Sequence, residues 1–133
     1  MVDTFNFGVP WENSYSFSQA IRAGGLVFVS GQLSHDQRGN FVGEGDFEKQ
    51  VRQTYANMKL VLGKFDLDLD DIVSKNVYVT DLASQFDTFS KVHKEFFPTG
   101  RVTSTIVEVK RFGLHQQLIE ISAVAIDGHN VVL

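Results

Sequence analysis

Apolar residues in the middle of the chain recur with the spacing of amphipathic helices. After Asp46, a good N-cap residue, they step by three or four positions and form one stripe, made of Phe47, Val51, Tyr55, Met58, Leu62 and Phe65. A second helix is predicted over Ala83–Phe97 and ends at Pro98. The inner side of this second helix is expected to carry Phe86, Phe89, His93, Phe96 and Phe97.

Five other segments have the composition of β-strands. Ser16–Ala23 and Leu26–Ser30 flank Gly24-Gly25, a pattern typical of a β-hairpin. Three further strands are predicted at Ile72–Thr80, Thr103–Val109 and Leu118–Ile126. Asp36–Gly45 is a polar loop, with a short strand expected around Asn40–Val42. Right-handed crossovers through the two helices would place both on the same face of one mixed sheet, which makes the fold α+β.

The face of this sheet that points away from the helices is expected to be partly apolar. A strand with one exposed side should alternate apolar and polar residues, but Leu26–Val29 does not alternate. In the last strand, the side away from the helices carries Leu118, Glu120, Ser122, Val124 and Ile126. Because no third helix is predicted to cover this surface, we expect the chain to self-associate.

Composition and charge exclude several classes of function. The 133 residues fit one domain over 1–133, with an N-terminal arm at 1–14 and a tail at 128–133. The net charge is −4 and the twelve Lys and Arg are scattered, so a nucleic-acid partner is disfavoured. The chain has no cysteine and no run of membrane-spanning length, so we expect a cytoplasmic protein without a membrane partner. The four histidines show no ligand spacing, so no metal site is expected.

Two glutamates stand inside apolar strands. Glu108 follows Thr105-Ile106-Val107, and Glu120 lies between Ile119 and Ile121. Alternation along each strand predicts that both carboxylates point away from the helices. Two interpretations stay open: polar residues at a wet subunit interface, or carboxylates in a cleft that holds water or an amine.

A series of short segments matches one family pattern in order and spacing. The segments are Phe17–Ala20, Leu26–Gln32, Gln50–Gln53, Asn57-Met58, Asp71–Val73, Val77–Leu82, Phe96–Pro98, Val107–Val109 and Ile119–Ile121. Together they resemble the Rid family, formerly called the YjgF family, whose older label is endoribonuclease L-PSP. The resemblance covers nearly the whole chain, and its opening is similar to the YjgH-like branch.

This resemblance implies a fold, an assembly and an activity. The implied fold is chorismate-mutase-like, and the implied assembly is a homotrimer with a small-molecule cleft between each pair of subunits. For the archetypal RidA members it implies hydrolysis of reactive imines and enamines to keto acids and ammonia, without metal or organic cofactor. In those members an arginine clamps the substrate carboxylate, a tyrosine lines the pocket and a glutamate helps to position water.

The chain departs from the family pattern at all three of those positions. Alignment on the motifs puts Ser104 at the arginine, Phe17 at the tyrosine and Ser122 at the glutamate, whereas Glu120 matches the other acidic residue of its strand. The resemblance therefore implies a catalytic set of Glu120, Ser122 and Ser30, and a ligand-binding set of Phe17, Gly31, Gln32, Arg101, Ser104 and Glu108. Arg101 is a poor substitute for the arginine, because its odd offset from Ser104 turns it to the other face.

Two functions remain open at this point. The first is hydrolysis of imines or enamines whose structure is altered to suit a cleft without the arginine clamp. The second is a non-catalytic trimer that binds a small metabolite or regulates a partner through the same clefts. A ribonuclease is disfavoured, because the net charge is negative and no general acid/base pair is evident.

Overall fold

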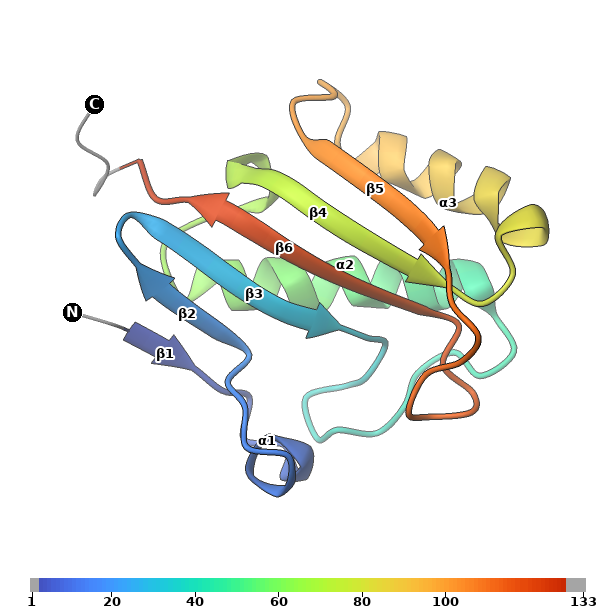
Figure 1. Cartoon of the computed structure of the whole chain (residues 1–133), viewed down its shortest axis with the longest axis horizontal. Helices are drawn as coiled ribbons and strands as arrows, with labels where there is room; N and C mark the ends of the chain where they lie inside the picture. The colour runs from blue at the N-terminus through green and yellow to red at the C-terminus, as the bar shows by residue number, and fades with distance from the viewer. Residues whose placement is uncertain (1–2, 129–133) are drawn as a thin grey trace.

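A computed structural model describes residues 3–128 as one six-stranded sheet with helices packed on it (Figure 1). The strands are β1 (Asp3–Phe5), β2 (Ala20–Ala23), β3 (Leu26–Gln32), β4 (Ile72–Val79), β5 (Thr103–Glu108) and β6 (Ile119–Ile126). The helices are α1 (Pro10–Ser14), α2 (Phe47–Gly63) and α3 (Leu82–Phe96), and a 3₁₀ turn spans Leu69–Asp71. The predicted tail lies mostly outside the described residues, and so does His129.

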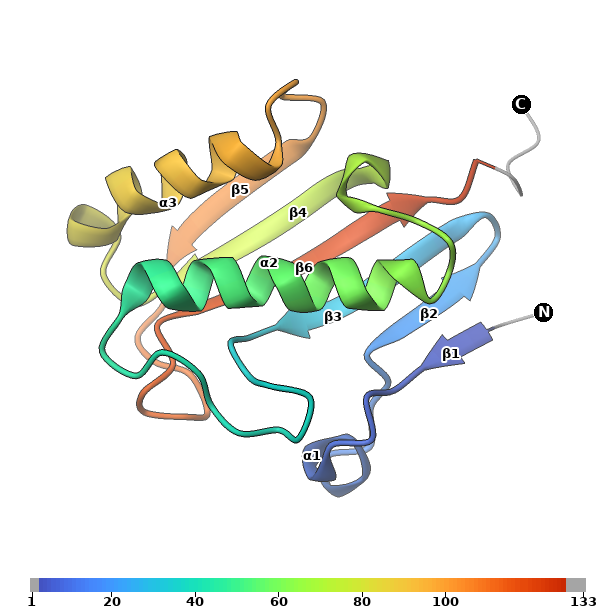
Figure 2. The same cartoon turned by 180° about the vertical axis from the view of Figure 1, so that it is seen from behind.

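The sheet is mixed and has the order β1-β2-β3-β6-β4-β5. Only the pair β4 and β5 is parallel among the described strands. Helices α2 and α3 lie together on one face (Figure 2). This arrangement confirms the predicted α+β fold with helices on one side of a mixed sheet.

The local signals in the sequence account for most of these elements. Gly24 and Gly25 both have positive φ, at 59° and 80°, as the two-residue turn between β2 and β3 requires. The side chain of Asp46 accepts a hydrogen bond from the Lys49 N–H and caps α2, as predicted. The strand expected around Asn40–Val42 is reduced to a single bridge between His35 and Phe41.

Two elements near the N-terminus were not predicted. Residues 3–5 form β1 along β2, and residues 10–14 form the short helix α1. The buried carboxylate of Glu12 fixes this segment, because it accepts hydrogen bonds from the backbone N–H groups of Phe7, Gly8 and Val9. Elements of three and five residues are too short to show a period, so the sequence pattern could not reveal them.

The core lies between the sheet and the two long helices. Helix α2 buries its predicted stripe, with Val51, Tyr55, Met58 and Leu62 fully enclosed. The orientation predicted for Phe86 is wrong: its side chain is 46% exposed. Helix α3 instead turns Gln85 inward, where the amide contacts the Asp81 N–H and the Thr80 hydroxyl, and this rotation carries the adjacent Phe86 outward.

A lysine of β4 is part of this core. Lys75 is 1% exposed, and its ammonium donates a hydrogen bond of 2.9 Å to Ser104 Oγ on β5. The Nζ atom lies 4.9, 5.4 and 5.7 Å from the ring centres of Phe89, Phe97 and Tyr55. Burial lowers the pKa of Lys75 to about 8, because the apolar surroundings disfavour the charged form.

We expect Lys75→Met to raise the free energy of unfolding near neutral pH. The native pKa of about 8 lies below the ordinary value of 10.5, so the unfolded chain binds more protons than the native chain between these values, and stability rises with pH there. The advantage of the Met variant should therefore shrink by about 3 kcal/mol between about pH 7 and 10.5. Urea denaturation of both proteins across this pH range measures the difference in their free energies of unfolding. A difference that does not change with pH would contradict the lowered pKa of Lys75.

Candidate functional site

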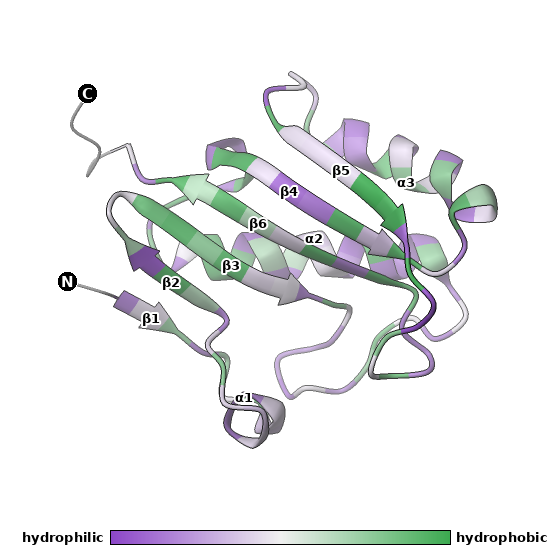
Figure 3. Cartoon of the chain, in the orientation of Figure 1, coloured by the Kyte–Doolittle hydropathy of each residue, from purple (hydrophilic) through white to green (hydrophobic). Residues whose placement is uncertain are grey.

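The face of the sheet away from α2 and α3, here called the open face, carries a defined set of side chains. Register pairs Phe28 with Val124, Asn76 with Ser122 and Tyr78 with Glu120, so these residues point to the same side. The open face of the four strands β3 to β6 consists of Leu26, Phe28, Ser30, Ser74, Asn76, Tyr78, Thr103, Thr105, Val107, Glu120, Ser122, Val124 and Ile126. The ribbon of β3 has a hydrophobic colour over most of its length (Figure 3), because residues of both its faces are apolar.

A bulge in β3 brings Glu120 against the backbone. The pairing between β3 and β6 shifts between Val29 and Gln32, so Ser30 and Gly31 stand out of register. A Cβ atom at Gly31 would come within 2.5 Å of the Glu120 carboxyl group. The carboxyl group therefore lies over Gly31, and a larger residue at this position would have to displace it. Burial raises the pKa of Glu120, against a weaker lowering by a hydrogen bond from Gln117.

Hydrogen bonds fix the bulge from beneath. The Ser30 hydroxyl donates to the Ser18 carbonyl at 2.7 Å, and its backbone N–H donates to the Gln19 carbonyl. The Gln32 amide donates to Gln19 Oε1 and to the Ser30 carbonyl. Gln32 is 1% exposed and does not reach the open face. The contacts of Gln32 hold the shape of the bulge. Because the Ser30 hydroxyl acts as a donor to Ser18, its oxygen can still accept a hydrogen bond.

A small groove of about 160 Å³ crosses the open face beside this bulge. Its lining consists of Phe28, Val29, Ser74, Asn76, Ser122, Ala123 and Val124. Hydroxyl and amide groups at Ser74, Asn76 and Ser122 give it hydrogen-bonding capacity, and Phe28 gives it an apolar wall. None of the described residues on the open face of β3 to β6 is a lysine or an arginine, so this face offers no positive charge to a substrate carboxylate within one subunit.

Comparison with known proteins places the chain in a family. The family model described as endoribonuclease L-PSP matches residues 11–127, which is most of the chain. The chain belongs to the endoribonuclease L-PSP family. Members of this family also carry the names RutC and YjgF.

Several relatives and solved structures of the L-PSP family are similar over most of the chain. A RutC family protein of Pyrococcus horikoshii is 34% identical over 109 residues, which cover 82% of this chain and 85% of that protein. The YjgH protein of Escherichia coli is 36% identical over 83 residues, 62% of each chain. The crystal structure of a Mycobacterium tuberculosis member of the YjgF/YER057c/UK114 family has a TM-score of 0.84 at 28% identity, covering 95% of this chain and 99% of that one.

Cellular location differs among the L-PSP relatives. The protein MMF1 of Saccharomyces cerevisiae is 30% identical over 112 residues, 84% of this chain and 75% of that protein, and its name places it in mitochondria. A cytoplasmic location for this chain stays a prediction. No helix within residues 3–128 is long and apolar enough to cross a membrane.

The structure separates the residues that the L-PSP resemblance had grouped. Ser104 pairs with the buried Lys75 and lies on the helix-covered side of β5. The orientation predicted for Glu108 is wrong: its carboxylate accepts a hydrogen bond from the Leu82 N–H at the start of α3. Ile106 packs on the core, and because alternate residues of a strand share a face, Ser104 and Glu108 point to the same side as Ile106. Alternation misled the prediction because Ile106 and Val107 are both apolar.

Ser104, which was aligned with the arginine, does not point to the open face. A shift of one residue exchanges the two faces of a strand. Thr103 and Thr105, rather than Ser104, therefore stand on the open face. Neither side chain is basic. The sequence alone gives no signal for this orientation, because it depends on the pairing of Lys75 with Ser104 between two strands.

Two other candidate residues lie at the ends of the sheet. Arg101 precedes β5, and its guanidinium donates to the Asp70 carbonyl before β4. That is the opposite end of the strands from Glu120, which pairs with Tyr78 late in β4. Phe17 is half-buried beside α1, in a surface hollow of about 280 Å³ next to Ser18. Within one subunit, the bulge brings Ser30, Gly31 and Glu120 together but not Arg101.

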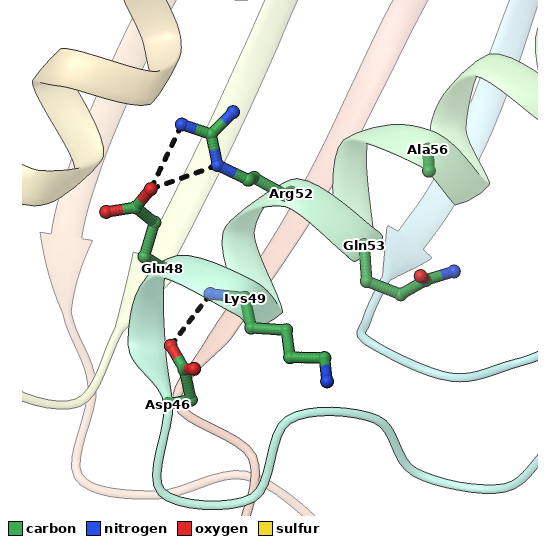
Figure 4. Close-up of a pocket in the computed structure, with 6 residues that line it drawn as sticks. All are labelled: Asp46, Glu48, Lys49, Arg52, Gln53 and Ala56. Carbon is green, nitrogen blue, oxygen red and sulfur yellow. Dashed lines mark hydrogen bonds and ion pairs between the residues drawn. The ribbon is translucent and has the colours of Figure 1, made fainter.

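Other surfaces of the L-PSP domain are weaker candidates for a site. A hollow of about 580 Å³ along α2 is lined by Asp46, Glu48, Lys49, Arg52, Gln53 and Ala56 (Figure 4). Several of its charges are already engaged. Lys91 and Arg52 both pair with Glu48 and lower the pKa of its carboxyl group, and Arg52 also pairs with Glu95 and lowers its pKa. Within residues 3–128, no three His, Asp or Glu side chains gather as a metal site would need.

We expect Gly31→Ala to be destabilising only while Glu120 is present. The new methyl group would overlap the Glu120 carboxyl group, and because the end of this flexible side chain can move aside, we expect a cost of at most about 1 kcal/mol. In a Glu120→Ala background the same change should cost nearly nothing. Chemical denaturation of the two single variants and the double variant measures the coupling. Gly63→Ala is the control, because a Cβ atom there meets no neighbour; equal costs in both backgrounds would show that Glu120 does not lie over Gly31.

Proposed function

We propose that the chain forms a homotrimer whose open faces meet, and that it hydrolyses reactive imines or enamines in the clefts between subunits. The observation that carries this proposal is the Glu120 carboxyl group held over Gly31 at the β3 bulge, beside the Ser30 hydroxyl. Membership of the L-PSP family supports the proposal, because the resemblance to its Rid members implies this chemistry.

The groups around the bulge suit attack of water on a C=N bond. Such a reaction needs a positioned water molecule and hydrogen bonds to the nitrogen more than a strong nucleophile. An ionised Glu120 would accept a proton from the attacking water, and its protonated form would donate one to the departing nitrogen. Because burial raises the pKa of Glu120, both forms are accessible closer to neutral pH than for an exposed glutamate.

The substrate is expected to lack a carboxylate next to the imine carbon. Charge-assisted hydrogen bonds from an arginine are the usual way to hold a carboxylate. The open face of β3 to β6 carries no basic side chain among the described residues. Imines of simple amines therefore fit this cleft better than imines of amino acids. The same lack of positive charge disfavours RNA as a substrate.

The trimer is inferred from the apolar side chains of the open face. Ile21, Phe28 and Val107 are 38%, 45% and 42% exposed in the isolated subunit, and Val124 and Ile126 extend the same surface. A patch of this kind marks an interaction site. The three-fold assembly itself is what the Rid resemblance implies.

We expect Phe28→Glu to convert the trimer to monomers. The variant places a charge at the centre of the apolar patch, and burying an unpaired charge is costly. Sedimentation equilibrium of the wild type should give three times the subunit mass, and of the variant the subunit mass. Phe86→Glu is the matched control, because Phe86 is equally exposed but lies on α3. A monomeric wild type, or dissociation by both variants, would contradict this assembly.

We expect the protein to accelerate ammonia release from imines made by an amine oxidase, with little effect on imines made by an amino-acid oxidase. Glu120→Gln should remove the acceleration and keep the trimer, because it preserves shape but cannot accept a proton. The acceleration is measured as the ammonia released per unit time with and without the protein. A rate unchanged by Glu120→Gln would rule out the role of this carboxyl group.

A non-catalytic metabolite-binding trimer is the second candidate, and the missing arginine favours it. A ligand of the native state raises the unfolding temperature, so a panel of small metabolites would reveal such binding by thermal shift. Ligand binding without any acceleration of ammonia release would support this second function over the first.

A further inference from the structure

The helix-covered side of the sheet holds a serine and a lysine in hydrogen-bond contact. Ser104 lies on β5, which is an edge strand of the described sheet, and its side chain is exposed. Lys75 lies beside it on β4 with almost no exposed surface, and its Nζ is 2.9 Å from Ser104 Oγ. The hydroxyl thus meets solvent on one side and a buried amine on the other.

The surroundings of Lys75 make this amine a base rather than a permanent cation. No ion pair joins Lys75 to a carboxylate within residues 3–128. The groups that face it are the rings of Tyr55 from α2 and of Phe89 and Phe97 from α3 and its end, and His93, whose pKa is lowered by its own burial and by the charge of Lys75. Tyr55 stays neutral, since burial raises its pKa.

The consequence is a sizeable neutral fraction of Lys75 near physiological pH. Burial lowers its pKa to about 8, and once neutral the amine has a free electron pair that can take the proton of a serine hydroxyl. A serine beside a desolvated lysine is an arrangement that activates the hydroxyl as a nucleophile. Lys75 has no contact with the open face, so this pair is independent of Glu120 and the β3 bulge.

We propose that Ser104 and Lys75 form a nucleophile–base pair that hydrolyses small uncharged esters at the edge of the sheet. The hydroxyl proton of Ser104 passes to the neutral Lys75 amine while Oγ forms a bond to the ester carbonyl carbon. The tetrahedral intermediate breaks its bond to the leaving alcohol, which takes the proton from the Lys75 ammonium. Water then loses a proton to Lys75 and attacks the acyl–Ser104 ester. The carboxylic acid leaves, and Ser104 Oγ recovers the proton.

The position of Ser104 sets the class of substrate. An edge strand presents backbone N–H groups that no neighbouring strand uses, and such groups are the usual donors to the oxygen of a tetrahedral intermediate. Ser104 lines none of the hollows described above. The site therefore suits a short acyl group on a good leaving group better than a long acyl chain.

The test uses the full-length protein with p-nitrophenyl acetate and with a fluorophosphonate that labels nucleophilic serines. We expect ester hydrolysis above the buffer rate, rising with pH to a plateau with a midpoint near 8, the native pKa of Lys75. The fluorophosphonate should add to the tryptic peptide of residues 102–110, whose one serine is Ser104. Absence of this adduct, or of hydrolysis above the buffer rate, would overturn the proposal.

Variants distinguish the pair from nonspecific reaction at the surface. Ser104→Ala and Lys75→Met should each reduce hydrolysis to the buffer rate, and the double variant should lose no more, because the two groups act as one unit. Ser14→Ala, at an exposed serine of α1, should keep the full rate. The unfolding temperature of each variant shows that it is folded. Hydrolysis that survives in folded Ser104→Ala would assign the activity elsewhere and contradict the proposal.

Discussion

The molecule is organised by a sheet that has helices on only one of its faces. Because successive side chains of a strand point to opposite sides, every strand residue is committed either to the core under α2 and α3 or to the open face. The bulge between Val29 and Gln32 is the one place in β3 where the pairing register shifts and the alternation is interrupted. The core, the apolar surface and the positions of the buried Lys75 and Glu120 follow from this division.

The division also places two kinds of chemistry on opposite sides of the same strands. On the open face, a carboxyl group lies over Gly31 in a region without positive charge. On the helix side, an amine without a carboxylate partner lies among aromatic rings. In both places burial shifts the pKa toward neutrality, upward for Glu120 and downward for Lys75. The physical cause is the same, because removal from water disfavours the charged form of either group.

The sequence revealed those features that are encoded locally and repeated. The α2 stripe, the Asp46 cap and the Gly24-Gly25 turn each depend on neighbours in the chain, and all three were predicted. The fold class and the apolar open face followed from them.

What the sequence missed depends on contacts between distant segments. Glu108 was placed on the wrong face because two adjacent apolar residues hide the alternation of β5. The burial of Lys75 was missed for another reason, since it needs rings from α2 and α3 to meet over β4. Similarly, the N-terminal segment is ordered by one buried glutamate, Glu12, which leaves no periodic pattern.

We infer that the open face is covered by other copies of the chain while the helix face stays in water. Carbene footprinting with mass spectrometry tests it within one sample, because Phe28 on the open face and Phe86 on α3 have nearly equal exposure in the isolated subunit, 45% and 46%. We expect strong labelling of Phe86 and weak labelling of Phe28 at concentrations where the protein is assembled. Equal labelling of the two phenylalanines would contradict it.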